Sequence, residues 1–306
     1  MSGAPRRPAS PLPSTTVGTN LDAFEVVDWG LLVGIALIWG SSFLLMAVGL
    51  DAFRPGVITL ARVALGTAAL ALVPAARRPI EPIDRARVVL LGVIWIALPM
   101  TLFPIAQQWI DSSVAGMVNA AVPITTAVWA TALLRRLPPT RQLIGIAIGF
   151  AGMVAIFLPE TGDTSGTALG TALAFLAVVL YGLSANLAVP LQQRYGALPV
   201  LLRAQLAALV LVVPFGLWQV PGSHWAWESA LAMLPLGILG TGLAFVLMAT
   251  LVGRVGGTRG SVAIYFVPLV AIFLGVLARD ERIEVLAIAG AGLVLLGAWA
   301  MSRREA

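Results

Sequence analysis

The chain has 306 residues, of which 59% are hydrophobic and only 11% are charged. A soluble domain is about 45–50% apolar and about 25% charged, so this composition excludes the ordinary soluble class. The formal net charge is +5, but most arginines lie between apolar runs, where they set membrane orientation rather than bind nucleic acid. The sequence therefore predicts a protein embedded in a lipid bilayer, with no nucleic-acid partner.

Several chemistries are excluded because the residue types that they need are absent. The chain has no lysine and no cysteine. It therefore cannot form a Schiff base with pyridoxal phosphate, hydrolyse nucleotide through a phosphate-loop lysine, or hold a metal through thiolates. Its single histidine, His224, lies in a predicted loop. We expect no enzyme activity, no cofactor and no metal site.

Residues 1–27 predict a disordered cytoplasmic tail, and its first twenty residues lack the apolar core of a signal peptide. Beyond the tail, apolar runs recur at about the 20-residue length with which a helix crosses a bilayer core about 30 Å thick. We expect an all-α polytopic membrane protein of ten transmembrane helices. The predicted spans are 29–50, 55–76, 87–108, 113–134, 142–159, 168–189, 198–219, 229–251, 259–279 and 284–302.

The placement of arginine predicts the orientation, because cytoplasmic loops carry an excess of positive charge. With both ends of the chain inside, only Arg54, Arg279 and Arg282 fall on the outer side. This bias predicts a bacterial inner-membrane protein with N-in, C-in topology and an even number of spans. The arginines on the inner side are Arg6, Arg7, Arg77, Arg78, Arg85, Arg87, Arg135, Arg136, Arg141, Arg194, Arg254, Arg259, Arg303 and Arg304.

The two halves of the chain, 28–160 and 167–302, read as repeats of five spans each. Several short motifs recur about 141–145 residues apart. Because five is odd, the halves must insert with opposite orientations, which is the inverted-repeat plan of secondary transporters. The matches are Leu91-Gly92 with Leu236-Gly237, Val122-Pro123 with Val267-Pro268, Gly145 with Gly290, Gly152 with Gly297, Trp39-Gly40 with Tyr181-Gly182, Ser42 with Ser184, and Arg62 with Arg203.

The first span contains Trp39-Gly40-Ser41-Ser42-Phe43, which resembles the motif of EamA-type members of the drug/metabolite transporter superfamily. The resemblance covers about residues 29–302, and Arg62, Pro123 and Pro268 also fit the family pattern. In the second half, Tyr181 replaces the tryptophan and Leu183 replaces the first serine, so the first-half motif is the stronger one. The resemblance implies a transporter of amino acids or other small metabolites, with a central cavity lined mainly by spans 1, 3, 4, 6, 8 and 9.

Arg62 and Arg203 are the charged residues well inside predicted spans. An arginine at a helix centre costs about 2.5–3.5 kcal/mol on insertion scales, so its retention needs a reason. One reason is a cavity in which the guanidinium meets a substrate carboxylate. The other is that the side chain snorkels or binds backbone carbonyls. The predicted substrate-binding residues are Trp39, Ser42, Arg62, Trp95, Asn119, Tyr181, Arg203 and Tyr265.

Pro123 and Pro268 lie near the middle of their predicted spans, where proline removes a backbone hydrogen bond. We expect both to mark gating kinks, with the freed carbonyls at residues 119 and 264 facing a polar cavity. Glycine-rich faces in the fifth and tenth spans predict close helix packing, which could lie within the chain or in a homodimer.

The small-molecule substrate is expected to be neutral, zwitterionic or anionic, because no Asp or Glu lies deep in any predicted span. The sequence thus predicts a secondary transporter, with export favoured, that works by alternating access. The alternatives are a non-transporting membrane scaffold and a lipid-handling membrane protein.

Overall fold

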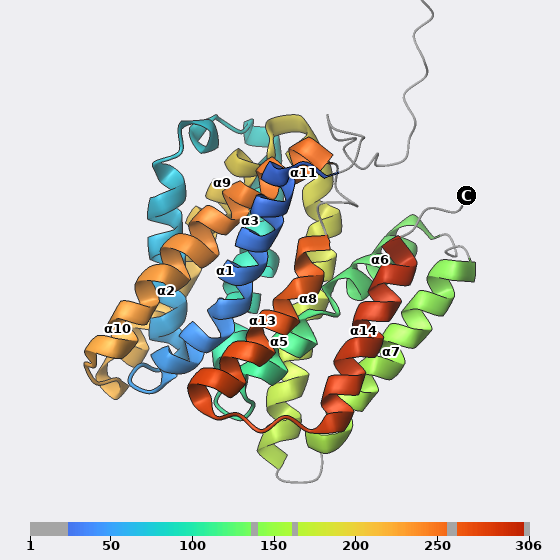
Figure 1. The fold of residues 1–306 in the computed structure, drawn as a ribbon. Coiled ribbons are helices and arrows are strands. Elements are labelled where there is room, and N and C mark those ends of the chain that lie inside the picture. The colour runs from blue at the N-terminus through green and yellow to red at the C-terminus, as the bar shows by residue number, and fades with distance from the viewer. Residues whose placement is uncertain (1–23, 136–139, 161–164, 256–261, 303–306) are drawn as a thin grey trace, which may run out of the picture.

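The computed structural model describes residues 24–135, 140–160, 165–255 and 262–302, and the regular structure of this part of the chain is entirely helical (Figure 1). Most of the predicted tail, residues 1–23, lies outside the described residues. So do six of the arginines predicted to lie on the inner side, namely Arg6, Arg7, Arg136, Arg259, Arg303 and Arg304.

The helices of the first half follow the predicted spans closely, but two spans are divided. The elements are α1 (Val26–Leu50), α2 (Pro55–Ala71), the 3₁₀ turns η1 (Pro74–Arg77) and η2 (Pro82–Asp84), α3 (Arg85–Leu91), η3 (Gly92–Ala97), α4 (Leu98–Ala106), α5 (Ser112–Asn119), α6 (Val122–Leu134) and α7 (Thr140–Glu160).

The second half has a similar order, except that its fourth segment, α13, is one continuous helix where the first half has α5 and α6. Its elements are α8 (Ser165–Tyr195), α9 (Ala197–Gln219), the 3₁₀ turn η4 (Val220–Gly222), α10 (Trp227–Leu234), η5 (Pro235–Leu243), α11 (Ala244–Val255), α13 (Val262–Arg279) and α14 (Val285–Ser302).

Six of the described helical segments are long and apolar enough to cross a membrane. They are Val26–Leu50, Pro82–Ala106, Ser112–Leu134, Gly166–Tyr195, Ala197–Gly222 and Trp227–Val255. Shorter apolar helices occupy Pro55–Ala71, Leu143–Ile156, Ala263–Arg279 and Val285–Gly297. The expectation of an all-helical membrane protein is confirmed.

Helix α8 is longer than its predicted span, which ended at residue 189. Its polar extension includes Gln192 and Gln193, and the helix ends at Tyr195 before Gly196. Gly196 has φ of 87°, a left-handed conformation that glycine adopts without strain. The hydropathy pattern missed this extension because helical backbone continued beyond the apolar run.

Two segments wind as π-helices at matched places in the two halves, η3 and η5. Such segments shift the backbone hydrogen-bond pattern and leave carbonyls available to other groups. In η5, Gly240 O accepts a bond from Trp39 Nε1 at 3.1 Å, and Thr241 O accepts one from Gln205 Nε2 at 2.8 Å. The η5 segment therefore binds side chains from α1 and α9 in the interior.

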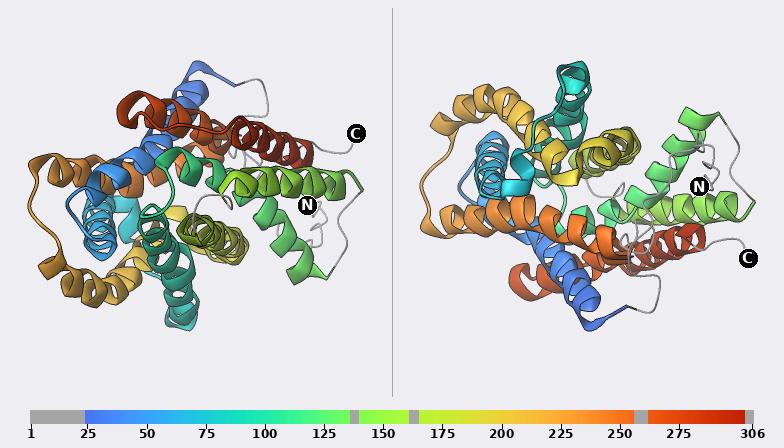
Figure 2. Two further views of the ribbon diagram at one scale, coloured as in Figure 1. Left: turned by 90° about the horizontal axis from the view of Figure 1, so that it is seen from below. Right: turned by 90° about the horizontal axis from the view of Figure 1, so that it is seen from above.

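Helices α7 and α14 lie side by side at one edge of the bundle (Figure 2). Their glycines make the close approach possible: a Cβ added to Gly290 would lie 2.7 Å from Gly152 O, and one added to Gly297 would lie 2.5 Å from Gly145 O. The predicted small-residue faces thus pack against each other within the chain. Whether the protein also forms a homodimer stays a prediction.

Substituting Gly290 by alanine is expected to lower stability, by about 1–3 kcal/mol, because the new methyl group must push the two helices apart. Gly292→Ala on the same helix is the matched control, since a Cβ there meets nothing within 4 Å. Thermal unfolding of the two purified variants in detergent checks this. Equal melting temperatures for the two variants would show that α7 and α14 do not pack as described.

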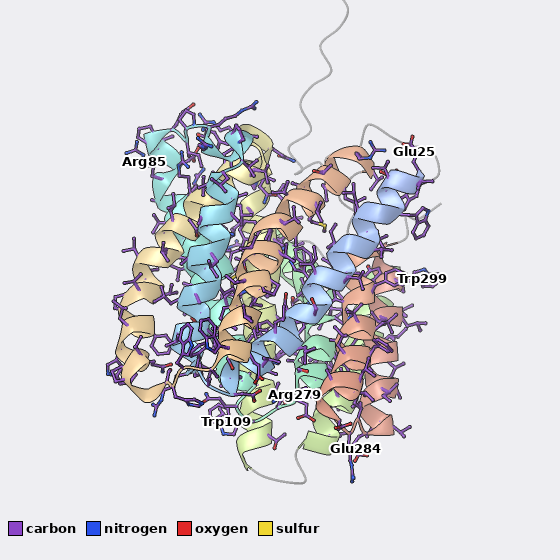
Figure 3. The ribbon with its side chains drawn as sticks, turned by 60° about the vertical axis from the view of Figure 1, so that its left-hand side comes forward. Glu25, Arg85, Trp109, Arg279, Glu284 and Trp299 are labelled. Atoms are coloured by element: carbon purple, nitrogen blue, oxygen red, sulfur yellow. The ribbon has the colours of Figure 1, made fainter. Side chains whose placement is uncertain are left out.

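The two ends of the bundle differ in their charged residues (Figure 3). Glu25 and Arg85 mark one end, here named the Glu25 end, and Arg279 and Glu284 mark the other, named the Arg279 end. At the Glu25 end, Arg254 pairs with Glu25 and Asp28, and Arg194 pairs with Glu81 and Asp84. This end holds the C-termini of α8 and α11, which matters for the pocket between them.

Candidate functional site

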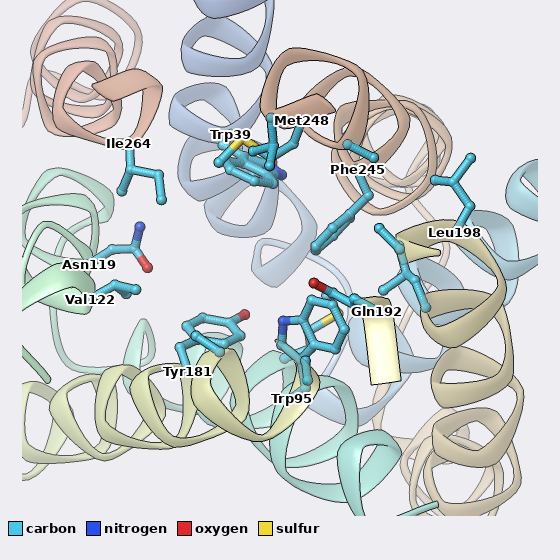
Figure 4. A pocket seen from close by; sticks show the side chains of 18 of the residues that line it. Trp39, Trp95, Asn119, Val122, Tyr181, Gln192, Leu198, Phe245, Met248 and Ile264 are labelled. Carbon is cyan, nitrogen blue, oxygen red and sulfur yellow. The ribbon is translucent and has the colours of Figure 1, made fainter. Parts of the chain in front are cut away.

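A central cavity of about 520 Å³ lies among the helices (Figure 4). Its size falls within the range of about 300–1,000 Å³ that is typical of small-molecule sites. The lining comes from the six segments that the family resemblance implied, with further residues from α2 and α9.

The cavity reaches toward the Glu25 end of the bundle. On α8 its lining extends to Gln193, and on α11 to Gly253. These residues directly precede Arg194 and Arg254, whose ion pairs lie at that end. On α1 the lining stops at Met46, about one turn before the helix ends at Leu50. We therefore call the region around Met46 the blind end of the pocket.

Aromatic side chains form two walls of the pocket. In one wall, the Phe245 ring lies edge-on to Trp39, with centroids 5.4 Å apart, and to Trp95, with centroids 5.8 Å apart. In the other wall, Phe103 stacks on Tyr181 at 6.1 Å and meets Phe43 edge-on. These pairs fix the rings in place, so the pocket offers a rigid, largely apolar surface.

Arg62 supplies a positive charge at the blind end. It is only 6% exposed; its Nε donates to Thr241 Oγ1 at 2.8 Å, and its Nη1 lies 3.4 Å from Met46 Sδ. In the part of the chain that the structure describes, no carboxylate lies within ion-pair distance of Arg62. A buried cation without a counter-ion is costly, which makes this guanidinium suited to an incoming anion.

Four further polar side chains in the lining have no hydrogen-bond partner among the described residues: Trp95, Asn119, Tyr181 and Gln192. In Figure 4 the Tyr181 hydroxyl and the Trp95 indole nitrogen turn toward the cavity and toward each other. Trp39 and Ser42 also line the pocket, but Trp39 Nε1 donates to Gly240 O and Ser42 Oγ donates to Ile38 O. Their polar groups are therefore already engaged.

The pocket brings together six of the eight predicted substrate-binding residues, Trp39, Ser42, Arg62, Trp95, Asn119 and Tyr181. Arg203 does not line it, because its guanidinium donates to the backbone carbonyls of Arg77 and Arg78. Tyr265 does not line it either, although its neighbour Ile264 does. Substrate binding by any of these residues stays a prediction.

The two prolines differ in their settings. Pro123 stands at the start of α6, directly after a break that separates α5 from α6, whereas Pro268 lies inside the continuous helix α13. Residues 119 and 264, whose carbonyls the prolines free, both line the pocket. The expected symmetric kink is thus a helix break in one half only, and its role in gating stays a prediction.

Sequence reasoning missed several lining residues, because nothing distinguishes an apolar cavity residue from a core residue in a hydrophobic span. Among the missed apolar residues are Met46, Met100, Phe103, Phe245 and Met248, whereas Gln192 was missed because it lies beyond residue 189, where the predicted span ended. One signal was present: residues 142 or 145 positions apart often line the pocket together. Such pairs are Trp39 and Tyr181, Phe43 and Ala185, Met46 and Ala188, Met100 and Phe245, Phe103 and Met248, and Asn119 and Ile264.

The Arg279 end is tied together by polar contacts between the two halves of the chain. Arg279 makes a two-pronged ion pair with Asp51, at 2.6 and 2.9 Å. Glu281 accepts bonds from the backbone N–H groups of Ser112 and Ser113 and from Ser112 Oγ, at 2.6–3.0 Å. We name Asp51, Ser112, Ser113, Arg279 and Glu281 the end clamp.

Asp111 lies beside the clamp, at the start of α5. Burial raises the pKa of its carboxyl above the usual range, and the negative charge of Glu281 raises it further, while Arg279 partly opposes both. The Asp111 carboxylate thus lies close to the Glu281 carboxylate of the clamp, and repulsion between them weakens the clamp when both are ionised.

Comparison with known proteins identifies the family. A model of the EamA-like transporter family matches residues 29–158 and again residues 168–303. The chain belongs to the EamA-like transporter family. The resemblance to EamA-type transporters that the motif at residues 39–43 indicated is therefore confirmed.

Relatives of this EamA-like chain are named as transporters. It is 25% identical to the uncharacterized transporter YoaV of Bacillus subtilis, over 87% of this chain and 93% of YoaV. It is 26% identical to the probable terminal-alkyne amino-acid exporter of Streptantibioticus cattleyicolor, over 90% and 93% of the two chains. It is also 26% identical to the uncharacterized inner membrane transporter YedA of Escherichia coli K12, over 81% of each.

A solved crystal structure shares the fold of this EamA-like protein. The TM-score is 0.65 at 18% sequence identity, and the match covers 91% of this chain and 99% of the other. The family match, the names of the relatives and the apolar helices together support a membrane transporter.

Proposed function

We propose that the protein is a secondary transporter that moves a small neutral, zwitterionic or anionic metabolite across the bacterial inner membrane by alternating access. Ten transmembrane helices, arranged as two inverted five-helix repeats at 28–160 and 167–302, would form the path. Both ends of the chain would lie in the cytoplasm, so the pocket mouth at the Glu25 end would face inward.

The packing of matched glycines supports the repeat arrangement. A Cβ on Gly92 would meet Ala204 O and Ala207, and a Cβ on Gly237 would meet Arg62 O and Leu65. Likewise, Gly40 packs on Val270, and Gly182 packs on Thr125. Equivalent positions of the two halves thus make equivalent contacts, which a two-fold relation between inverted repeats would produce.

The asymmetry of the bundle ends supports alternating access. The pocket extends toward the Glu25 end, whereas the end clamp and the Phe43–Phe103 contact lie toward the Arg279 end. The clamp contacts join residues of the first half to residues of the second. Opening the pocket to the outside would require these contacts to separate as one half rocks against the other.

The observation that carries the substrate class is the uncompensated charge of Arg62. None of the described residues that line the pocket is aspartate or glutamate, so a cationic substrate would find no counter-charge. The printed name of the Streptantibioticus relative, an amino-acid exporter, is compatible with this class and favours export.

Comparative metabolite profiling of cells and medium, with and without overexpression, tests transport. We expect a changed extracellular solute, and we expect Trp39→Ala to abolish the change because it removes the pocket wall against Phe245 and the bond to Gly240. Trp218→Ala is the matched control: this exposed tryptophan lies outside the pocket lining. An unchanged solute profile on overexpression would favour the scaffold alternative, and robust quaternary-cation/proton antiport in liposomes would contradict the substrate class.

A further inference from the structure

Three side chains in the pocket lining, Arg62, Trp95 and Tyr181, have N–H or O–H groups that make no hydrogen bond among the described residues, and the Asn119 and Gln192 amides share this lining. Arg62 has guanidinium N–H groups beyond those bound to Thr241 and Met46. The Trp95 indole N–H and the Tyr181 hydroxyl have no partner among the described residues. An indole and a guanidinium can only donate, so this group calls for a ligand that accepts.

All three side chains line the same cavity. Figure 4 shows the Tyr181 hydroxyl turned toward the Trp95 nitrogen. Phe103 stacks on the Tyr181 ring and holds it in this position. A carboxylate has two oxygens with about four acceptor sites, which is enough to receive bonds from all three side chains.

The remainder of the pocket is apolar. Trp39 and Phe245 face the cavity on one side, and Met248 and Leu198 continue this surface toward the mouth (Figure 4). No described lining residue carries a carboxylate, so the pocket has no ionic partner for a substrate ammonium group. The pocket thus favours a negatively charged ligand group, which it can bind beside Arg62.

We propose that the pocket selects small organic carboxylates with an aromatic or branched aliphatic body, and that an amino group on the substrate is not required. The carboxylate accepts hydrogen bonds from Arg62, Trp95 and Tyr181 near the blind end. The apolar body packs against the wall that Trp39 and Phe245 form together. This inference rests on the proposed transport function, because it names the substrate of the same pocket.

A matched set of four probes tests the selectivity: 3-phenylpropanoate, its neutral amide, phenylalanine, and the cationic 3-phenylpropylamine. Binding to the purified full-length protein in lipid nanodiscs is measured by calorimetry at pH 7. We expect 3-phenylpropanoate to bind at least about tenfold more tightly than the amide, because hydrogen bonds to a charged group are the stronger ones. Phenylalanine should bind no more tightly than 3-phenylpropanoate, and the amine should bind most weakly.

Variants of the pocket lining test where the substrate carboxylate binds. Arg62→Gln should bring the ratio of carboxylate to amide affinity close to one, whereas Arg203→Gln should leave the ratio unchanged because Arg203 lies outside the pocket lining. If Arg62→Gln does not fold, Tyr181→Phe keeps the ring stack and removes one donor, and should reduce the ratio several-fold.

The proposal is overturned if no probe binds, if the amide or the amine binds as tightly as the carboxylate, if phenylalanine binds at least tenfold better than 3-phenylpropanoate, or if the ratio survives both Arg62→Gln and Tyr181→Phe. Flux in liposomes separates this result from the proposed function. Binding of carboxylates without flux of any solute would reject transport alone. Flux of a solute together with equal binding of carboxylate and amide would reject this selectivity alone.

Discussion

Replacing Arg62 by methionine is expected to stabilise the protein and to abolish transport. The guanidinium is buried without a counter-ion among the described residues. Replacing even a buried ion pair by well-packed apolar residues is often neutral or stabilising by about 1–4 kcal/mol, and Arg62 has no such pair to lose. Methionine is unbranched and flexible, so it can occupy the space of the arginine stem. The apparent melting temperature at a fixed scan rate should therefore rise by several degrees.

The bonds that Arg62→Met removes do not reverse this expectation. Thr241 Oγ1 loses the Arg62 donor but still donates to Leu236 O at 3.3 Å, so its hydroxyl keeps a partner. The contact with Met46 Sδ is a weak one. The lost bonds are thus smaller in free energy than the desolvation of the charge.

Arg203→Met is the matched control for this prediction. The Arg203 guanidinium binds backbone carbonyls in the loop after α2, outside the pocket lining, so its loss should leave solute flux intact. A lower melting temperature of Arg62→Met with normal flux would show that Arg62 has a structural role. A gain in stability with loss of flux is the pattern of a residue retained for function.

The contrast between Arg62 and Arg203 also shows where sequence reasoning reached its limit. The repeat comparison matched them with each other, 141 residues apart. The glycine contacts instead favour aligning Arg62 with Ala204 and Leu65 with Ala207. A shift of one residue turns a side chain by about 100° around a helix. That rotation is enough to point one arginine into the pocket and the other to a loop.

Other features were predictable because they depend on composition and local pattern. Apolar length placed the helices, and the first-span motif pointed to Trp39 and Ser42, which line the pocket. The end clamp was not predictable. Asp51 and Arg279 lie 228 residues apart in the chain, and nothing local to either residue reveals which loops meet when the helices pack.

Within the clamp, the hydrogen bonds of Glu281 should stabilise the closed Arg279 end more than the ion pair of Asp51 with Arg279 does. The Arg279 and Asp51 side chains are 36% and 50% exposed, so water screens them, and pairs of this kind contribute about 0–1 kcal/mol. Glu281 instead accepts from two backbone N–H groups at the start of α5 and from one hydroxyl. Hydrogen bonds to a charged group contribute about 1.5–3 kcal/mol each.

Glu281→Gln should therefore raise the fraction of molecules that are open at the Arg279 end by about tenfold. Asp51→Asn should raise this fraction only a few-fold. The chain has no cysteine of its own, so a cysteine introduced at Ala185 would be the single thiol that a maleimide can label. Ala185 is a small residue of the pocket lining, so the rate of labelling measures how accessible the pocket is. With the inner side at the Glu25 end, a membrane-impermeant maleimide should label Ala185→Cys slowly in intact cells and faster in inverted vesicles. Adding Glu281→Gln should raise the labelling rate in intact cells.

Two nearby acidic residues serve as controls for the clamp. Glu284 lies at the same end with an exposed side chain outside the clamp contacts, so Glu284→Gln should not change labelling. Asp111→Asn removes the charge that faces Glu281 and should slow outside labelling, because it relieves repulsion within the closed end. If Glu281→Gln and Glu284→Gln label alike, the contacts at the Arg279 end do not control access, and closure of the pocket to the outside must instead depend on the apolar contact of Phe43 with Phe103.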